Sequence, residues 1–415
     1  MRSARDVRSL HGSALLDGLT ALPSAALRAA VREDGPVQTT ILDDPPTAVE
    51  SAGWWSSLSD GDRTRMLDDA PQVVGTLEGI PYAVRDTANR EYLRRAVRAA
   101  HRDVGTPGAM TTMLGQIDAS LDEQPGDPPK TLLTVDLRGT GRVAIAIGDL
   151  DTARDVTVLV PGMFFTVTGQ LADWTDTAVD LYQEQATLSP VASVAPASTG
   201  RVGEGSGIAV IAWMGYHTPD LSSVMSLRLA HEGAPRLERV VTGLDMMRAA
   251  TPPRVSVVAH SYGSTTSLIA LATGRIHVDS LTVIGSPGST VAHADQLAVP
   301  TGQVFVGNAK WDPIAGTGYF GTDPGSRSFG SRVLDLDGGP DWAADGDVFR
   351  RPRGHNDYLK PGTASLHDIA LIVIGRSDLV PDRTRIPGGA GGHDGNGPGS
   401  PDFLVVRPQD LLVRD

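Results

Sequence analysis

The sequence contains no cysteine among its 415 residues. This absence excludes disulfides, thiolate metal sites and a cysteine nucleophile, so any covalent catalysis must use another side chain. Basic residues are also in the minority, because 36 lysines and arginines face 49 aspartates and glutamates, which gives a formal net charge of −13. Without a basic face the chain is not expected to bind nucleic acid.

Long hydrophobic runs are missing as well. No stretch approaches the roughly 18 uninterrupted apolar residues that a membrane span needs. The basic N-terminal segment MRSARDVRSLHGSALLDGL has no apolar run of signal-peptide length. We therefore expect no membrane span and a cytoplasmic location, which the lack of cysteine also fits.

Composition and periodicity divide the chain into four parts. Helical spacing of apolar residues predicts a mostly helical N-terminal region over residues 1–105. The polar, proline-rich segment DEQPGDPP at 122–129 indicates a linker or surface loop, which we place at 106–130. Residues 131–376 are predicted to form an α/β catalytic domain, and 377–415 a flexible tail rich in glycine and proline.

Eight short apolar segments with many β-branched residues follow residue 130. They are TLLTVDL, RVAIAIGDL, DVTVLV, GIAVIAW, RVSVVA, SLTVIG, QVFVG and RVLDL. Several are too apolar to have a solvent-exposed face, and most are separated by helix-sized segments, which predicts a mainly parallel sheet with helices on both faces. Only RGTGR joins the first two, so the sheet should open with an antiparallel hairpin. A last helix is predicted over 365–375.

The fifth of these strands runs directly into a serine. Residues 254–274, RVSVVAHSYGSTTSLIALATG, predict a strand, a sharp turn at Ser261 and a helix that begins at once. Ala259 and Gly263, two positions to either side, are small enough for strand and helix to approach each other. This pattern is typical of a nucleophile elbow, G-x-S-x-G with alanine in the first position. The alternative is an ordinary strand-to-helix turn that carries an incidental serine.

A nucleophilic serine needs a histidine to accept its proton and a carboxylate to orient that histidine. In the α/β-hydrolase fold, which this elbow resembles, the three follow in the order Ser, acid, His. The histidines after Ser261 are His277, His293, His355, His367 and His393. The first two come too early for the fold, His367 lies in the last helix and His393 lies in the tail. His355, in a polar loop after the eighth strand, is the candidate base.

The candidate acid is Asp312, in QVFVGNAKWDPIAG a few residues after the seventh strand. Asp323, Asp335 and Asp337 are competing carboxylates in the segments that follow. Aspartate before proline or glycine commonly caps turns, and this alternative applies to Asp312 as well.

Two backbone N–H groups should receive the developing oxyanion. One belongs to Tyr262, directly after the nucleophile, and the other to Met163, in the loop VPGMFFTVTG after the third strand. Aromatic residues of this loop and of the segment that ends the fourth strand are predicted to line an acyl pocket: Phe164, Phe165, Trp213 and Tyr216. For the two phenylalanines, ordinary core packing is the alternative.

Motifs over residues 50–376 resemble an uncharacterised bacterial α/β-hydrolase family. They are WW at 54–55, GIP at 79–81, RDTANR at 85–90, GDLDTA at 148–153, VPGM at 160–163, AWMGY at 212–216, AHSYG at 259–263, DPI at 312–314 and GHNDYL at 354–359. The resemblance implies the α/β-hydrolase fold behind a helical region, and a triad of Ser261, Asp312 and His355. It implies no substrate. Met163 and the two phenylalanines after it depart from the small polar residues that relatives tend to carry, which bears on pocket shape.

The expected chemistry is hydrolysis of a small acyl ester or thioester through an acyl-enzyme at Ser261. We expect no cofactor and no metal, because no plausible cluster of histidine or carboxylate ligands accompanies the serine. Transfer of the acyl group to an acceptor other than water, and a non-catalytic binding role on the same fold, are the alternatives.

Overall fold

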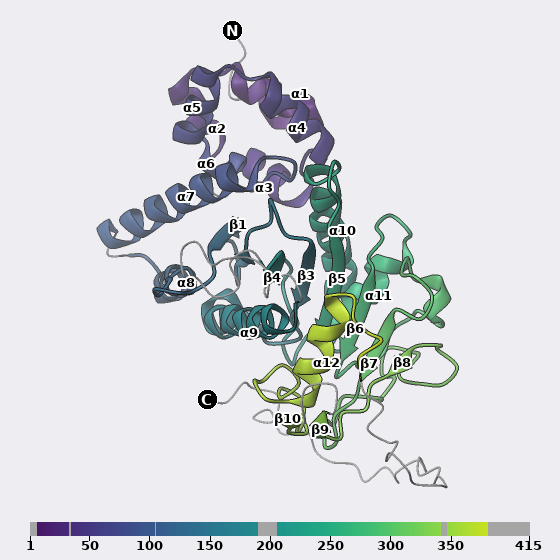
Figure 1. Cartoon of the computed structure of the whole chain (residues 1–415). Coiled ribbons are helices and arrows are strands. Elements are labelled where there is room, and N and C mark those ends of the chain that lie inside the picture. The colour runs from purple at the N-terminus through teal and green to yellow at the C-terminus, as the bar shows by residue number, and fades with distance from the viewer. Residues whose placement is uncertain (1–5, 33–34, 104, 190–205, 342–346, 381–415) are drawn as a thin grey trace, which may run out of the picture.

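The computed structural model describes residues 6–32, 35–103, 105–189, 206–341 and 347–380. At its centre lies an eight-stranded sheet in the order β1-β2-β4-β3-β5-β6-β7-β8 (Figure 1). The strands are β1 (Lys130–Asp136), β2 (Arg142–Gly148), β3 (Asp155–Val160), β4 (Ile208–Met214), β5 (Arg254–His260), β6 (Ser280–Ile284), β7 (Val304–Gly307) and β8 (Arg332–Val333). Each predicted strand is present, although β8 is reduced to two residues whose side chains are exposed.

Strand directions confirm a mainly parallel sheet that opens with an antiparallel hairpin. β1 pairs antiparallel with β2, β2 pairs antiparallel with β4, and the remaining pairs are parallel. Because Val143 of β2 pairs with Met214 of β4, the start of β2 lies beside the carboxyl end of β4. The start of β2 therefore shares the edge of the sheet at which β5 ends in the elbow.

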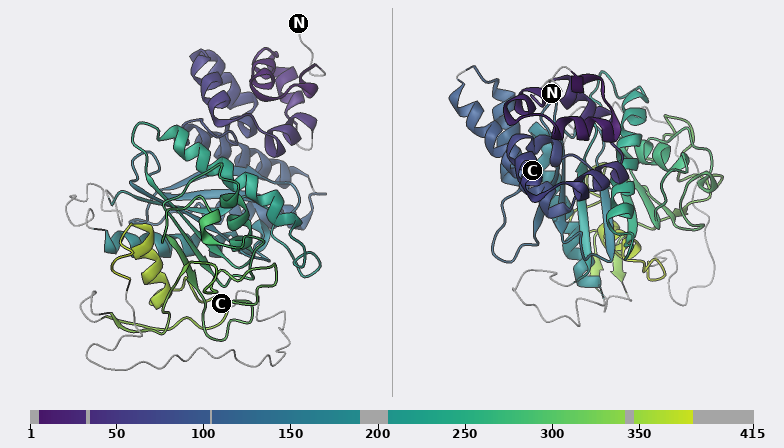
Figure 2. Two further views of the ribbon diagram at one scale, coloured as in Figure 1. Left: turned by 90° about the vertical axis from the view of Figure 1, so that its right-hand side faces the viewer. Right: turned by 90° about the horizontal axis from the view of Figure 1, so that it is seen from above.

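Helices cover both faces of the sheet (Figures 1 and 2). One face carries α9 (Val167–Leu188) and α12 (Ala364–Val373), and the other carries α10 (Arg228–Met247) and α11 (Tyr262–Ala272). Strand residues alternate between the two cores, as a period of two requires. In β4, Val210 and Ala212 enter the core under α9, while Ile211 and Trp213 enter the core under α10.

The N-terminal region is helical, as the periodicity predicts, and has a hydrophobic core of its own. It comprises η1 (Asp6–Ser9), α1 (Gly12–Thr20), α2 (Ser24–Ala30), α3 (Pro36–Asp43), α4 (Ala48–Ser57), α5 (Asp60–Asp69) and α6 (Pro71–Val74). A capping box begins α4, where Glu50 N donates to Thr47 Oγ1 and Thr47 N donates to Glu50 Oε2, at 3.2 and 2.8 Å. These helices form a layer above the sheet in Figure 1.

The long helix α7 (Tyr82–Arg102) joins this layer to the sheet. Asn89 Nδ2 donates to Leu132 O at 2.8 Å, and Leu132 N donates to Asp86 Oδ1 at 2.7 Å. Arg85, which is buried, donates to Leu133 O at 2.8 Å. The RDTANR motif therefore binds the backbone of β1.

A helix occupies part of the segment 106–130, where a linker or surface loop is predicted. Helix α8 (Gly108–Ser120) buries Met113, Leu114 and Ile117 against α9 and the sheet. The prediction is therefore wrong for residues 108–120. The proline-rich composition is limited to the segment that begins at residue 122, whereas residues 108–120 have apolar side chains at helical spacing. The loop itself is confined to the residues between Leu121 and β1.

Two further segments complete the described chain. A small antiparallel pair, β9 (Gly339–Asp341) and β10 (Asp347–Phe349), lies in the Asp-rich segment after β8. The predicted tail falls almost wholly in residues 381–415, which lie outside the described residues. Of the helices in the described ranges, none combines the length and apolar character needed to cross a membrane.

Candidate active site

Ser261 lies at the turn between β5 and α11 with φ 55° and ψ −128°. A positive φ is uncommon for a residue other than glycine and persists only where the surroundings hold it. Here Ser261 N donates to Ile284 O of β6 at 2.9 Å, and Ser264 Oγ donates to Ser261 O at 2.6 Å. These contacts fix the strained turn that carries the candidate nucleophile.

Glycines allow the loop after β3 to reach this turn. A Cβ at Gly263 would lie 2.4 Å from Pro161 O, and a Cβ at Gly162 would lie 2.5 Å from Ser261 Cβ. Neither position tolerates a side chain without a backbone shift. Small residues at the elbow therefore allow the β3 loop, as well as the strand and helix of the elbow, to approach closely. This loop contacts the serine directly.

His355 joins Ser261 to Asp312. Its Nε2 lies 2.8 Å from Ser261 Oγ, and its Nδ1 lies 2.9 and 3.0 Å from the two carboxylate oxygens of Asp312. Both the serine and the imidazole are buried. The structure thus brings together the three residues that the sequence singles out, although they lie up to 94 positions apart.

The Asp312 carboxylate is held by further donors. Tyr358 Oη donates to Oδ2 at 2.6 Å, and the backbone N–H of Ile314 donates to Oδ1 at 2.8 Å. Burial alone would raise the pKa of Asp312, but hydrogen bonds and charge from His355, with the bonds from Tyr358 and Ile314, lower that pKa below its ordinary value. Asp312 is therefore an ionised acceptor for the Nδ1–H of His355.

The other histidines have different partners. His293 Nδ1 lies 3.0 Å from Ser328 O, and His367 Nδ1 lies 2.8 Å from Glu184 Oε1. His277 is exposed, and His393 lies outside the described residues.

The competing aspartates satisfy turns and ion pairs. Asp323 accepts a hydrogen bond from Gly325 N at 2.8 Å, and Asp335 accepts one from Asp337 N at 3.1 Å. The carboxylate of Asp337 pairs with Lys310 at 3.0 Å. Within the described residues, no group of three or more histidines, aspartates and glutamates is arranged to hold a metal ion.

The candidate oxyanion donors belong to two different elements. Tyr262 is the first residue of α11, so its N–H has no acceptor within the helix. Met163 is buried and directly follows Gly162, which contacts the serine. The next N–H of that loop is already used, because Phe164 N donates to Pro219 O at 3.0 Å.

The predicted acyl pocket is only partly supported by the positions of its residues. Phe165 packs edge-on against Trp174 at 4.9 Å and lines a cavity of about 40 Å³ with His260. Phe164 is half-buried and has a φ of 64°.

Trp213 and Tyr216 are buried in the core under α10. Their rings stack at 5.7 Å, and Tyr216 Oη donates to Pro161 O at 2.7 Å. Their part in an acyl pocket stays a prediction. Trp213 faces the α10 side because it alternates with Ala212, and Tyr216 supports the β3 loop from behind.

Two residues near Ser261 were not assigned a role from the sequence. Tyr358 binds Asp312, and the ring of His260 lies 4.6 Å from the ring of His355. Both stand inside the family-like motifs GHNDYL and AHSYG, which was the only signal available for them.

The sheet order, the elbow after β5 and the positions of the three residues define the α/β-hydrolase fold. A family model described as Alpha/beta hydrolase matches residues 136–322, in agreement with the resemblance seen in the sequence. The fold alone assigns neither the substrate nor the reaction.

Similar sequences occur in mycobacteria. The chain is 30% identical over 418 residues to the uncharacterized protein Rv2079 of Mycobacterium tuberculosis, a match that covers 86% of this chain and 59% of that protein. It is 29% identical over 228 residues to the uncharacterized protein Rv0963c, covering 52% of this chain and 80% of that protein. The chain therefore spans about three fifths of the length of Rv2079.

Solved structures of hydrolases are more distant. The serine hydrolase XC6422 from Xanthomonas campestris has a TM-score of 0.34 at 15% identity, covering 63% of this chain and 98% of its own. Carboxyl esterase 2 from Tuber melanosporum has a TM-score of 0.38 at 12% identity, covering 69% and 99%.

Proposed function

We propose that this protein is a serine hydrolase that cleaves a small-molecule ester or thioester through an acyl-enzyme at Ser261. The observation that carries the proposal is the continuous chain of short contacts from Ser261 Oγ to His355 Nε2 and from His355 Nδ1 to Asp312, at 2.8 and 2.9 Å. A serine hydroxyl is a weak nucleophile that becomes effective when a positioned imidazole takes its proton.

In the proposed reaction, Ser261 Oγ attacks the acyl carbon while its proton passes to His355 Nε2. Asp312 stabilises the imidazolium and keeps its Nδ1–H oriented. The N–H groups of Tyr262 and Met163 would receive the oxyanion of the tetrahedral intermediate. The imidazolium then returns the proton to the departing alcohol or thiol. Water, deprotonated by the same imidazole, releases the acid and restores Ser261.

A fluorophosphonate probe tests the nucleophile, because it labels an activated serine without knowledge of the substrate. We expect labelling of the wild-type protein and of Ser56→Ala, an exposed serine on α4, and none of Ser261→Ala. Circular dichroism should show that all three are folded. Equal labelling of Ser261→Ala would refute the assignment.

A panel of p-nitrophenyl esters and acyl thioesters of graded chain length then identifies the substrate class. Turnover of one series with loss in Ser261→Ala supports hydrolysis of that class. Labelling without turnover of either series would argue for another acyl acceptor. A cytoplasmic location is part of the same proposal, and cell fractionation with detection of the native protein tests it.

A further inference from the structure

Two cavities adjoin each other between the N-terminal helices and the sheet. One, of about 370 Å³, is lined by apolar side chains that include Ile41, Leu42 and Trp213. The other, of about 500 Å³, is more polar and includes His217. Both have four wall residues in common, which are Arg142, Pro235, Arg236 and Arg239. We call this shared space the arginine cleft.

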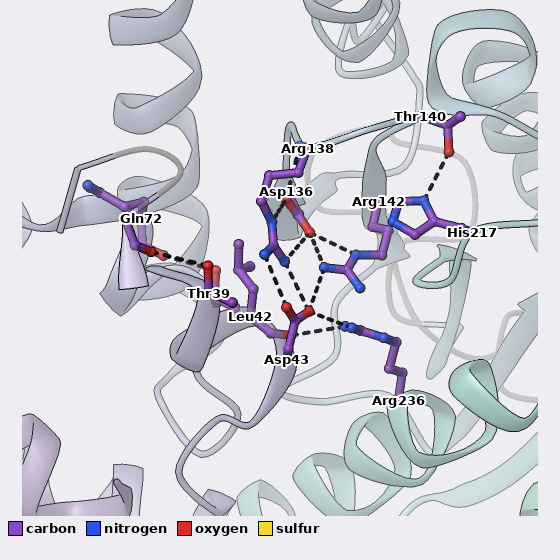
Figure 3. A network of polar contacts seen from close by, with 12 residues as sticks. Thr39, Leu42, Asp43, Gln72, Asp136, Arg138, Thr140, Arg142, His217 and Arg236 are labelled. Atoms are coloured by element: carbon purple, nitrogen blue, oxygen red, sulfur yellow. Dashed lines mark hydrogen bonds and ion pairs between the residues drawn. The ribbon is translucent and has the colours of Figure 1, made fainter. Parts of the chain in front are cut away.

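Three arginines at the cleft, Arg138, Arg142 and Arg236, share two aspartates, so one positive charge among them is left over. Asp43 accepts hydrogen bonds from Arg138, Arg142 and Arg236 at 3.0, 3.2 and 2.8 Å, and Asp136 pairs with Arg138 and Arg142 (Figure 3). Burial would raise the pKa of Asp43, but the arginines outweigh burial and lower that pKa below its ordinary value. Both carboxylates are therefore fully used by these three cations.

Arg239 is a fourth cation, and it has no matching anion. Among the residues that the structure describes, its guanidinium makes no hydrogen bond and no ion pair. Burial and the neighbouring charge of Arg236 lower the pKa of Arg239 to about 10. A guanidinium has five N–H donors in a planar fork that fits a carboxylate or a phosphate.

The nearby glutamates already have partners of their own. Glu78 accepts from Arg85 at 2.9 Å, and Glu232 accepts from Arg228 at 2.6 Å. Glu238 accepts from Thr273 Oγ1 at 2.9 Å and pairs with Arg275 at 3.4 Å. The surplus positive charge of the cleft is thus not removed by the acidic side chains around it.

We propose that the arginine cleft binds a small amphipathic anion, whose carboxylate or phosphate group accepts hydrogen bonds from Arg239 while its apolar part occupies the cavity beside Trp213. The cavity volume falls in the range of sites for small molecules. Ser261, Asp312 and His355 line neither cavity. The site is therefore separate from the proposed hydrolase site and does not depend on its activity.

Isothermal titration calorimetry with octyl phosphate, octanoate and octylammonium tests the proposal on the full chain. We expect at least one of the two anions to bind the wild-type protein and octylammonium not to bind. The tighter anion identifies the head group. In Arg239→Gln, Kd for that anion should rise at least about tenfold, because a charge-assisted hydrogen bond to the anion is lost.

Arg94→Gln is the matched control, because Arg94 is an exposed arginine on α7 that pairs with Glu91. Its Kd should equal that of the wild type. No binding of either anion to the wild type, or equal Kd in Arg239→Gln and the wild type, would overturn the proposal. The second result would place the alkyl anion elsewhere, including at the acyl site.

Thermal unfolding provides a second readout, which distinguishes ligand binding by Arg239 from a purely structural role. Removal of an unpaired cation among other cations should leave the Tm of the free protein unchanged or raise it. The tighter anion should raise the Tm of the wild type and not that of Arg239→Gln. A lower Tm for free Arg239→Gln together with an undiminished shift by the anion would show that Arg239 stabilises the fold without binding the ligand.

Discussion

His260 Nε2 lies 2.6 Å from the backbone carbonyl oxygen of His355. Since a carbonyl can only accept, Nε2 of His260 carries the proton and donates it. Burial, followed by the proximity of His355, lowers the pKa of His260 below its ordinary value of 6.5. His260 is thus a neutral, buried donor that ties the loop of His355 to the end of β5, directly beside Ser261.

We expect His260→Phe to lower kcat by about 10- to 100-fold with little change in KM, because small displacements of a catalytic group cost rate more than binding. Steady-state kinetics on the substrate found in the ester and thioester panel would measure both constants. His260→Gln, which keeps a side-chain N–H donor, should recover part of the loss. An unchanged kcat in His260→Phe would show that His355 is positioned without this bond.

His260 should also make the protein sensitive to acid. Its folded-state pKa is below 6.5, so unfolding takes up a proton, and the stability from its neutral state is present above pH 6.5 and lost as pH falls below it. Urea unfolding at several pH values should show a shallower fall in the free energy of unfolding for His260→Gln than for the wild type. His293→Ala, a change away from this core, should keep the wild-type slope.

Asp312→Asn should lower kcat by roughly 10³ to 10⁴, the scale seen when a triad carboxylate is neutralised. Asp323→Asn and Asp337→Asn are matched controls, because their carboxylates serve a turn and an ion pair. Both should retain kcat close to the wild-type value. A large loss confined to either control would move the acid to that residue.

Tyr358→Phe should destabilise the protein by about 1–3 kcal/mol, because Tyr358 Oη both donates to Asp312 and accepts from Ala309 N, at 2.6 and 2.8 Å. The change leaves the buried Ala309 N–H without its partner. Chemical unfolding of the two proteins would give the difference in free energy. Tyr319→Phe, at a half-exposed ring, should be neutral by comparison.

Arg85→Met should cost about 3 kcal/mol or more, because it removes the buried partner of Glu78 and the hydrogen bond from Arg85 to Leu133 O. Arg94→Met, at an exposed position of the same helix, should change the free energy of unfolding little. Comparable unfolding free energies for the two variants would show that the Arg85 contacts contribute little to stability.

The sequence predicted those features that depend on local pattern. The apolar run of β5, the serine and Gly263 lie within ten residues, so their geometry follows from strand and helix preferences alone. Chain order in the fold then selected Asp312 and His355, which the structure places in contact. Catalysis by these residues stays a prediction.

Contacts between distant segments that the chain order of the fold does not specify were not predicted. His260 meets the backbone of His355 across 95 positions, and its role could not be inferred from either segment alone. The face of the sheet on which Trp213 lies depends on the register of β4, which sequence alone did not fix. The proposed anion binding by Arg239 depends on three other arginines that already occupy the two nearby aspartates, and the sequence does not show this arrangement.

The attachment of α7 to β1 has a consequence for how the protein behaves when cut. β1 is an outermost strand, and side chains of α7 occupy backbone groups that face away from β2. A fragment that begins after residue 105 would present these groups to solvent, where a strand from a second molecule could pair with them. Such a fragment should therefore self-associate. In the full chain, α7 protects the edge strand β1 from pairing with a second molecule.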